Sequence, residues 1–283
     1  MNKKILFLFF AIWVSSCASN TVQTDSLYRS PNSLKASVNN IAPYIEQEVG
    51  HCGPATLAMA IAATGSPYKI DEITSQVYTP NAKGSLQENM TTTARRQGFM
   101  ALQITGLKSL LAELDAGHSV IIFENLGINW IPQWHYALVT GYDLANKTLI
   151  MHSGPHPNQF IDMGEFELSW RLTNYWALVV LNPGDLSASS DEVTHLQAAA
   201  ALERVQKLDA AKRAYLGILS AWPRSLIARI GLGNVYYNLG DYSSAVSYLQ
   251  AATELHPDSI EARTNLQIAK EALLAAGRNS LAR

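Results

Sequence analysis

The chain contains very little cysteine: two residues, Cys17 and Cys52, in 283. Small secreted domains that depend on disulfides need several cysteine pairs, so this class of protein is excluded. Cys17 ends a short apolar leader, where processing is expected to use it. Cys52 then remains as the single thiol of the mature chain, without a disulfide partner. It is therefore either a reactive thiol or a buried structural one.

Charge is also sparse, at 16% of residues, with a formal net charge of -2. The sequence has no basic patch, so nucleic acid is not an expected partner. It has no P-loop, which excludes a fused ATPase. His152 and His156 lie four residues apart, but Pro155 and Pro157 oppose the helix that would align them on a metal. We therefore predict neither a cofactor nor a metal.

Long apolar runs are missing after the leader, so no membrane-spanning helix is expected there. The leader itself has a ten-residue apolar stretch, Ile5 to Val14, too short to span the ~30 Å of a bilayer core. Residues 1–16 are predicted to be a lipoprotein signal peptide, because Val14-Ser15-Ser16-Cys17 resembles a bacterial lipobox. The resemblance implies lipidation of Cys17 and, without an Asp after it, an outer-membrane position facing the periplasm. The alternative is an ordinary signal peptide with a chance cysteine.

Breaks in composition divide the mature chain into two domains. A polar tether is expected over 17–40, a first domain over 41–183, a turn-rich linker over 184–191 and a repeat domain over 192–283. In the first domain, patterns typical of helices come first and short β-rich runs follow, which indicates an α+β fold. The expected helices are 54–64, 85–97 (with a capping box at Ser85-Leu86-Gln87-Glu88) and 107–116, and the expected strands are 119–123, 135–142, 148–152 and 176–181.

The last domain has an internal period of 34 residues, shown by Trp222-Pro223 and His256-Pro257. This is the tetratricopeptide period, and it predicts paired helices. The unit that ends at Pro257 matches the consensus well, the preceding unit is degenerate, and Ile260 to Ala276 supplies a capping helix. Such a short array is close to the lower limit for independent stability, so we expect it to lean on the first domain and to bind a protein partner.

The surroundings of Cys52 are typical of a nucleophile. The residue precedes Gly53-Pro54 at the start of an expected helix, whose free amides favour negative charge. A histidine in a later strand, His135, can take the thiol proton, and the amide of Gln47 can stabilise an oxyanion. From these features we predict an accessible thiol of low pKa. The alternative is a buried structural thiol.

The two motifs together resemble a known family. Gln47…Cys52-Gly53-Pro54-Ala55 and Trp134-His135-Tyr136-Ala137-Leu138-Val139 are similar to the bacteriocin-processing, double-glycine-leader cysteine peptidases of the papain-like superfamily. The similarity is greatest to a solo, lipoprotein branch with C-terminal tetratricopeptide repeats. It implies a papain-like α+β domain followed by an all-α repeat domain, with Cys52 as nucleophile, His135 as base and Gln47 as oxyanion donor.

One departure leaves the third catalytic member open. The family usually has Asp-Pro after the strand that follows the histidine, whereas this chain has His152-Ser153-Gly154-Pro155. Ser153, Asn158 or Asp162 are the candidates to orient the imidazole. The missing carboxylate supports a non-catalytic peptide-binding protein as one alternative function. A thioester-forming acyltransferase is another, because fold and dyad do not fix the acceptor.

Two further features leave alternatives open. Trp130, Pro132 and Trp134 form either a wall of a substrate site or part of the core. His51, next to the nucleophile, is interpreted as a loop residue, with tuning of the thiol as the alternative.

Overall fold

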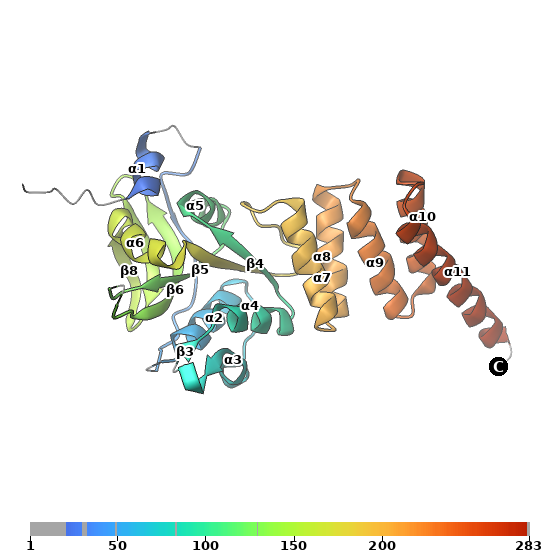
Figure 1. The fold of residues 1–283 in the computed structure, drawn as a ribbon, viewed down its shortest axis with the longest axis horizontal. Helices are drawn as coiled ribbons and strands as arrows, with labels where there is room; N and C mark the ends of the chain where they lie inside the picture. Colours follow the sequence, from blue (N-terminus) through green and yellow to red (C-terminus); the bar gives the residue numbers. More distant parts are fainter. Residues whose placement is uncertain (1–20, 30–32, 49, 83, 129, 282–283) are drawn as a thin grey trace, which may run out of the picture.

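The computed structural model describes residues 21–29, 33–48, 50–82, 84–128 and 130–281. The predicted signal peptide and Cys17 lie outside these ranges. None of the helices within them is both long and apolar enough to span a bilayer. The chain forms a mixed α/β domain followed by a row of paired helices, which confirms the predicted fold class (Figure 1).

An antiparallel sheet forms the frame of the first domain. Its strands follow the order β4-β9-β5-β6-β7-β8, and β1 pairs with the far end of β6. The strands are β1 Ser37–Asn39, β4 Met100–Thr105, β5 Val120–Asn125, β6 Trp134–Asp143, β7 Thr148–Ser153, β8 His156–Asp162 and β9 Trp176–Leu181. A separate ribbon pairs β2 (Tyr78–Thr79) with β3 (Gly84–Ser85).

Helices cover both faces of this sheet because its central strands are apolar on both sides. Ile121 and Leu138 face the helices α2 (Cys52–Ala63), α3 (Ile70–Val77) and α4 (Gln87–Arg96). Val120 and Val139 face the opposite core, which contains α5 (Leu107–Asp115) and α6 (Met163–Trp170). Strand alternation thus separates two cores, and α2 is held with its first residue near the start of β6.

Most of the expected elements are present, with one correction in helix capping. The four expected strands agree with β5, β6, β7 and β9, whereas β4 and β8 were not foreseen. The capping box at Ser85 is wrong: Ser85 belongs to β3, α4 begins after Leu86, and no side chain caps that helix. The strand pairing of Ser85 with Tyr78 takes precedence over the local capping pattern.

The expected tether is also corrected, because part of it folds onto the domain. Helix α1 (Val22–Arg29) packs against α5 and α6, and the amides of Gln23 and Thr24 donate to the buried Glu167 carboxylate at 2.9 and 2.7 Å. The side chain of Gln23 in turn accepts a hydrogen bond from the amide of Leu107. The polar residues that made this segment look like a linker are partners for buried polar groups.

The C-terminal region consists of five helices in the described residues. They are α7 (Glu192–Arg204), α8 (Leu208–Ala221), α9 (Leu226–Asn238), α10 (Tyr242–Leu255) and α11 (Ile260–Leu281). A side chain at Gly233 would collide with Leu249, so glycine allows α9 and α10 to approach closely. This arrangement agrees with two helix pairs and a terminal helix.

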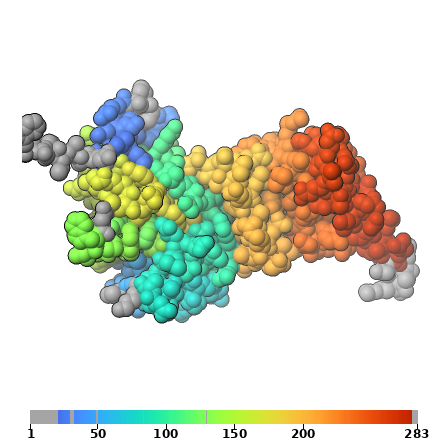
Figure 2. Space-filling view, viewed as in Figure 1, coloured from blue at the N-terminus to red at the C-terminus, as the bar shows by residue number. Residues whose placement is uncertain are grey.

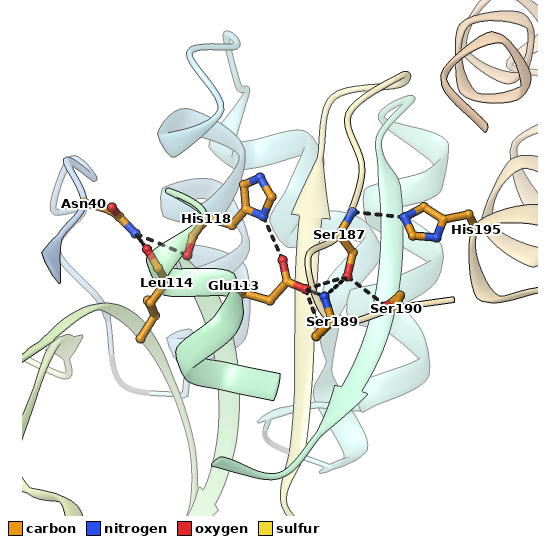
Figure 3. A network of polar contacts seen from close by, with 8 residues as sticks. All are labelled: Asn40, Glu113, Leu114, His118, Ser187, Ser189, Ser190 and His195. Carbon is orange, nitrogen blue, oxygen red and sulfur yellow. Dashed lines mark hydrogen bonds and ion pairs between the residues drawn. The ribbon is translucent and has the colours of Figure 1, made fainter. Parts of the chain in front are cut away.

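The repeats are attached firmly to the first domain, as expected for so short an array. Ala198 and Leu202 of α7 belong to the same buried core as Leu102 of β4. The segment expected to be a linker is part of this junction: Glu113 of α5 binds Ser187 and Ser189 (Figure 3). The predicted linker is thus a docked segment, whose serines satisfy a buried carboxylate.

Candidate active site

Cys52 is the first residue of α2, as the Gly-Pro sequence after it predicts. The helix is almost fully buried beyond this point, and the Thr56 hydroxyl donates to the carbonyl of Tyr136, which ties α2 to β6. His51 precedes the thiol and stacks on Tyr78, with ring centroids 4.6 Å apart. The thiol is half-buried at the point where helix and strand meet.

The electrostatics of this thiol differ from the sequence-based expectation. Burial raises the pKa of Cys52, and the backbone amides of Tyr136, Gly53 and Cys52 itself act in the opposite direction without overcoming it. Desolvation penalises the thiolate more than the helix start favours it. The expected low-pKa thiol is therefore not what this structure gives: Cys52 is protonated at neutral pH.

His135 lies at the start of β6 and is held from one side. Its Nε2 lies 3.0 Å from the hydroxyl oxygen of Ser153, and this leaves Nδ1 as the ring nitrogen available to another group. Burial lowers the pKa of His135, so the ring is neutral at pH 7. Within the described residues no hydrogen bond joins the His135 ring to the Cys52 thiol, although both residues line one cavity.

That cavity has a volume of about 780 Å³ and contains an unused hydrogen-bond donor. Gln47 lines it together with Cys52 and His135, and the Gln47 Nε2 atom is buried without a partner. A buried donor without a partner is costly, which makes this atom a candidate for binding an incoming oxygen. The apolar part of the lining comes from Leu86, Phe123, Trp134, Tyr136 and Pro155.

Of the three candidates for the third member, Ser153 alone contacts the His135 ring in the described structure. Asp162 caps helix α6 by accepting from the amides of Gly164 and Glu165. Asn158 donates its backbone amide to Nδ1 of His152. Among the described residues, no hydrogen bond joins the side chain of Asp162 or Asn158 to the His135 ring.

Two residues near the site were not singled out by the sequence. Ser85 lines the cavity, its Oγ is buried without a partner, and a side chain at Gly53 would collide with it. Glu124 lies opposite His135 in the β5–β6 register, and burial raises the pKa of its carboxyl, which accepts from Ser169. No sequence motif points to either residue as part of the site. Ser85 has the pattern of a helix cap, and Glu124 lies in β5, on the other strand of the hairpin that contains His135.

The remaining histidine and tryptophan alternatives are also decided by position. His152 has both ring nitrogens engaged, with the Ala42 carbonyl and the Asn158 amide, so neither is free for a metal. Trp134 lines the cavity, whereas Trp130 and Pro132 are exposed outside it. Core packing is therefore wrong for all three residues, and the wall alternative is supported for Trp134 but not for Trp130 or Pro132.

Comparison with known families agrees with this architecture. Residues 39–178 match the Peptidase_C39 like family, and residues 197–267 match the tetratricopeptide repeat. The first domain is thus similar to the C39-like peptidase family, and the helical region that follows is similar to the tetratricopeptide repeat. The comparison with curated proteins gives no match.

Three solved structures resemble the first domain. One is a double glycine motif protease from an AMS/PCAT transporter in complex with the leader peptide, with 21% identity and a TM-score of 0.41 over 50% of this chain and 93% of that chain. The peptidase domain of Streptococcus ComA, a bifunctional ABC transporter, has 23% identity and a TM-score of 0.41 over 50% and 98%. A C39-like peptidase from Bacillus anthracis has 15% identity and a TM-score of 0.45 over 52% and 98%.

Proposed function

We propose that this protein is a cysteine peptidase that cleaves a peptide or protein bond through Cys52 and His135. The observation that supports this most is the unpartnered Gln47 amide in the same cavity as the thiol and the Ser153-bound imidazole. A buried donor beside a nucleophile matches the need of a tetrahedral intermediate, whose oxygen becomes negative only during the reaction.

The reaction begins from a neutral Cys52 thiol and a neutral His135 imidazole. Nδ1 of His135 accepts the Cys52 proton as the sulfur attacks the carbonyl carbon, and the Gln47 amide and the Cys52 backbone N–H bind the resulting oxyanion. The imidazolium then protonates the leaving amine as the C–N bond breaks, which leaves a thioester. Water, deprotonated by the same imidazole, releases the acid and restores the thiol. Because the resting thiol is not ionised, proton transfer accompanies attack.

The test uses a small panel of peptidyl vinyl sulfones, which alkylate a thiol only when it acts as a nucleophile. We expect a mass increase confined to Cys52, abolished in Cys52→Ala and strongly slowed in His135→Ala. Absence of labelling across the panel, with intact folding, would refute the proposal.

A non-catalytic peptide-binding domain is the second candidate, favoured by the raised pKa of Cys52 and the neutral Ser153 in the place of a carboxylate. Under that hypothesis peptides bind the cavity, yet Cys52 remains unreactive toward the vinyl sulfones. An acyltransferase would react with them, but its product with an added amine would be an amide rather than the free acid.

We also propose that Cys17 carries lipid and holds the protein at the outer membrane, facing the periplasm. The support is the lipobox-like sequence that precedes Cys17. In a bacterial host, Cys17→Ser should release the protein from the membrane fraction or block its maturation. Unchanged migration and fractionation would contradict the anchor.

The repeats are proposed to bind a protein partner or the substrate. A cavity of about 350 Å³ between α9 and α11 is lined by Asn234, Tyr237, Asn265 and Ile268. Replacing Tyr237 by Ala should weaken capture of a cross-linked native partner while Cys52 labelling persists. Retained capture would place the partner elsewhere.

A further inference from the structure

The connection between β5 and β6 displays an unusual set of apolar side chains. We call residues 125–128 and 130–134 the apolar hairpin. Trp130 is 80% exposed and Ile131 is 63% exposed, and Leu126, Ile128 and Trp134 are also exposed. No charged residue occurs between Asn125 and Trp134 in the sequence. Several large apolar side chains exposed within one short segment usually mark an interaction site.

The hairpin is well built rather than a frayed loop. The Asn125 side-chain oxygen accepts from the amides of Gly127 and Gln133, at 2.9 and 2.8 Å. Ile128 and Ile131 exchange backbone hydrogen bonds, and Leu126 donates to the Gln133 carbonyl. Several backbone groups of its described residues are therefore satisfied internally, which lowers the cost of moving them out of water.

The side-chain chemistry fits lipid better than a charged or polar partner. Tryptophan is enriched at membrane interfaces, where its ring is amphipathic, and isoleucine and leucine partition into the acyl boundary. The hairpin offers no charge for pairing with an acidic or basic peptide.

The position of the hairpin relative to the chain start points to the same partner. Three residues lie between Cys17 and Thr21, and a fully extended chain over these four residue steps spans at most ~14 Å. Helix α1 is bound to Glu167 of α6. Helix α6 in turn is bound to β5, the strand that leads into the hairpin, because Ser169 donates to Glu124. Figure 2 shows the blue N-terminal segment and the light-green segments at the end of the molecule away from the orange and red repeats. A lipid on Cys17 would hold this end at the bilayer surface.

We propose that the apolar hairpin inserts into the lipid interface of the membrane. The inference rests on the lipid anchor of the proposed function for its geometry. Since Trp134 belongs to the hairpin and also lines the cavity, insertion brings the cavity next to the bilayer. The substrate would then be met at the membrane surface.

The test uses the mature chain from Ala18, which contains every described residue and carries no lipid. Flotation with phosphatidylethanolamine–phosphatidylglycerol vesicles measures binding, and quenching of tryptophan fluorescence by brominated lipids measures insertion. We expect vesicle binding by the unmodified chain and about a tenfold or larger loss in the double variant Trp130→Ser, Ile131→Ser. The matched control, Ile260→Ser with Leu274→Ser, removes exposed apolar residues of the repeats and should bind as the unmodified chain does.

Several results would overturn the proposal: no flotation of the unmodified chain, equal loss in both double variants, or a dimer that dissociates only in the hairpin variant. A hairpin variant that binds vesicles normally but cleaves or labels with a changed peptide preference would assign the hairpin to the substrate instead. Flotation needs neither catalysis nor Cys17. A negative flotation result would therefore contradict the hairpin proposal alone, and the peptidase activity and the lipid anchor are tested by their own experiments.

Discussion

Replacement of Glu113 should reveal how strongly the repeats are fixed to the first domain. Glu113 has no exposed surface, and one of its carboxylate oxygens accepts from Ser187 Oγ, Ser189 N and Ser189 Oγ at 2.5, 2.8 and 2.6 Å. The other oxygen lies 2.7 Å from Nδ1 of His118. Ser187 N also donates to His195 of α7, so the carboxylate lies at the centre of the network (Figure 3).

The magnitude depends on which replacement is made. Glu113→Ala leaves several buried donors without an acceptor, and breaking such a charged network typically costs about 3–5 kcal/mol of the free energy of unfolding. Glu113→Gln keeps an oxygen toward the serines and can turn its amide toward His118, so it loses mainly the charge assistance, about 1–3 kcal/mol in total. We expect wild type to be the most stable, Glu113→Gln to be less stable, and Glu113→Ala to be the least stable.

The pH dependence follows from the same contacts. Burial alone would raise the pKa of Glu113, but the hydrogen bonds from His118, Ser187 and Ser189 outweigh it and the pKa is lowered. A carboxyl whose folded pKa is depressed contributes stability that is present above its unfolded pKa, about 4.3, and is lost as the pH falls through the folded value. The difference in free energy of unfolding between wild type and Glu113→Ala should therefore become smaller as the pH falls from the unfolded pKa to the folded one.

Urea unfolding followed by far-ultraviolet circular dichroism and tryptophan fluorescence measures these changes. Glu261→Ala, on the exposed start of α11, is the control and should change stability by no more than about 0.5 kcal/mol. A Glu113→Ala protein as stable as this control at neutral pH would refute the role assigned to the network.

Three predictions concern the cavity. The rate of Cys52 alkylation by iodoacetamide should rise with pH around a midpoint above the ~8.5 of free cysteine, because burial raises its pKa, and a midpoint below that value would contradict the neutral thiol. Gln47→Leu should lower the peptidase kcat by about 10²–10³-fold while leaving Cys52 alkylation by iodoacetamide unchanged, and an unaltered kcat would remove Gln47 from the oxyanion site. His135→Ala should lower kcat by about 10²–10⁴-fold and Ser153→Ala by less, with Ser153→Asp expected to raise activity; full activity in His135→Ala would exclude it as the base.

Much of this architecture was predictable because it depends on local pattern. The start of α2 follows from Gly53-Pro54, and the repeat helices follow from a fixed period that close helix packing imposes. The positions of β6 and β7 follow from runs of apolar residues with a turn between them. Each of these signals can be found along the chain itself, in a few neighbouring residues or in a regular period.

The features that the sequence did not predict depend on contacts between distant segments. Ser85 has the pattern of a helix cap, yet its position is set by pairing with Tyr78 and by the space above Gly53. The polar residues of α1 have a linker-like composition, but the Gln23 side chain accepts from the Leu107 amide and the Thr24 hydroxyl donates to the Met163 carbonyl. The thiol pKa depends on how much water the folded domain removes from Cys52, which no motif encodes.

The shared core of the junction has a consequence for how this protein can be divided. The peptidase family match ends at residue 178, but α7 completes a core that includes Leu102, and α8 approaches so closely that a side chain at Gly217 would collide with Gly184. The cooperative folding unit is therefore longer than the family segment. Removing all of 192–283 would uncover apolar surface along β4. Partner recruitment is better tested by a truncation that ends after α8, which keeps the junction and removes only the outer helices.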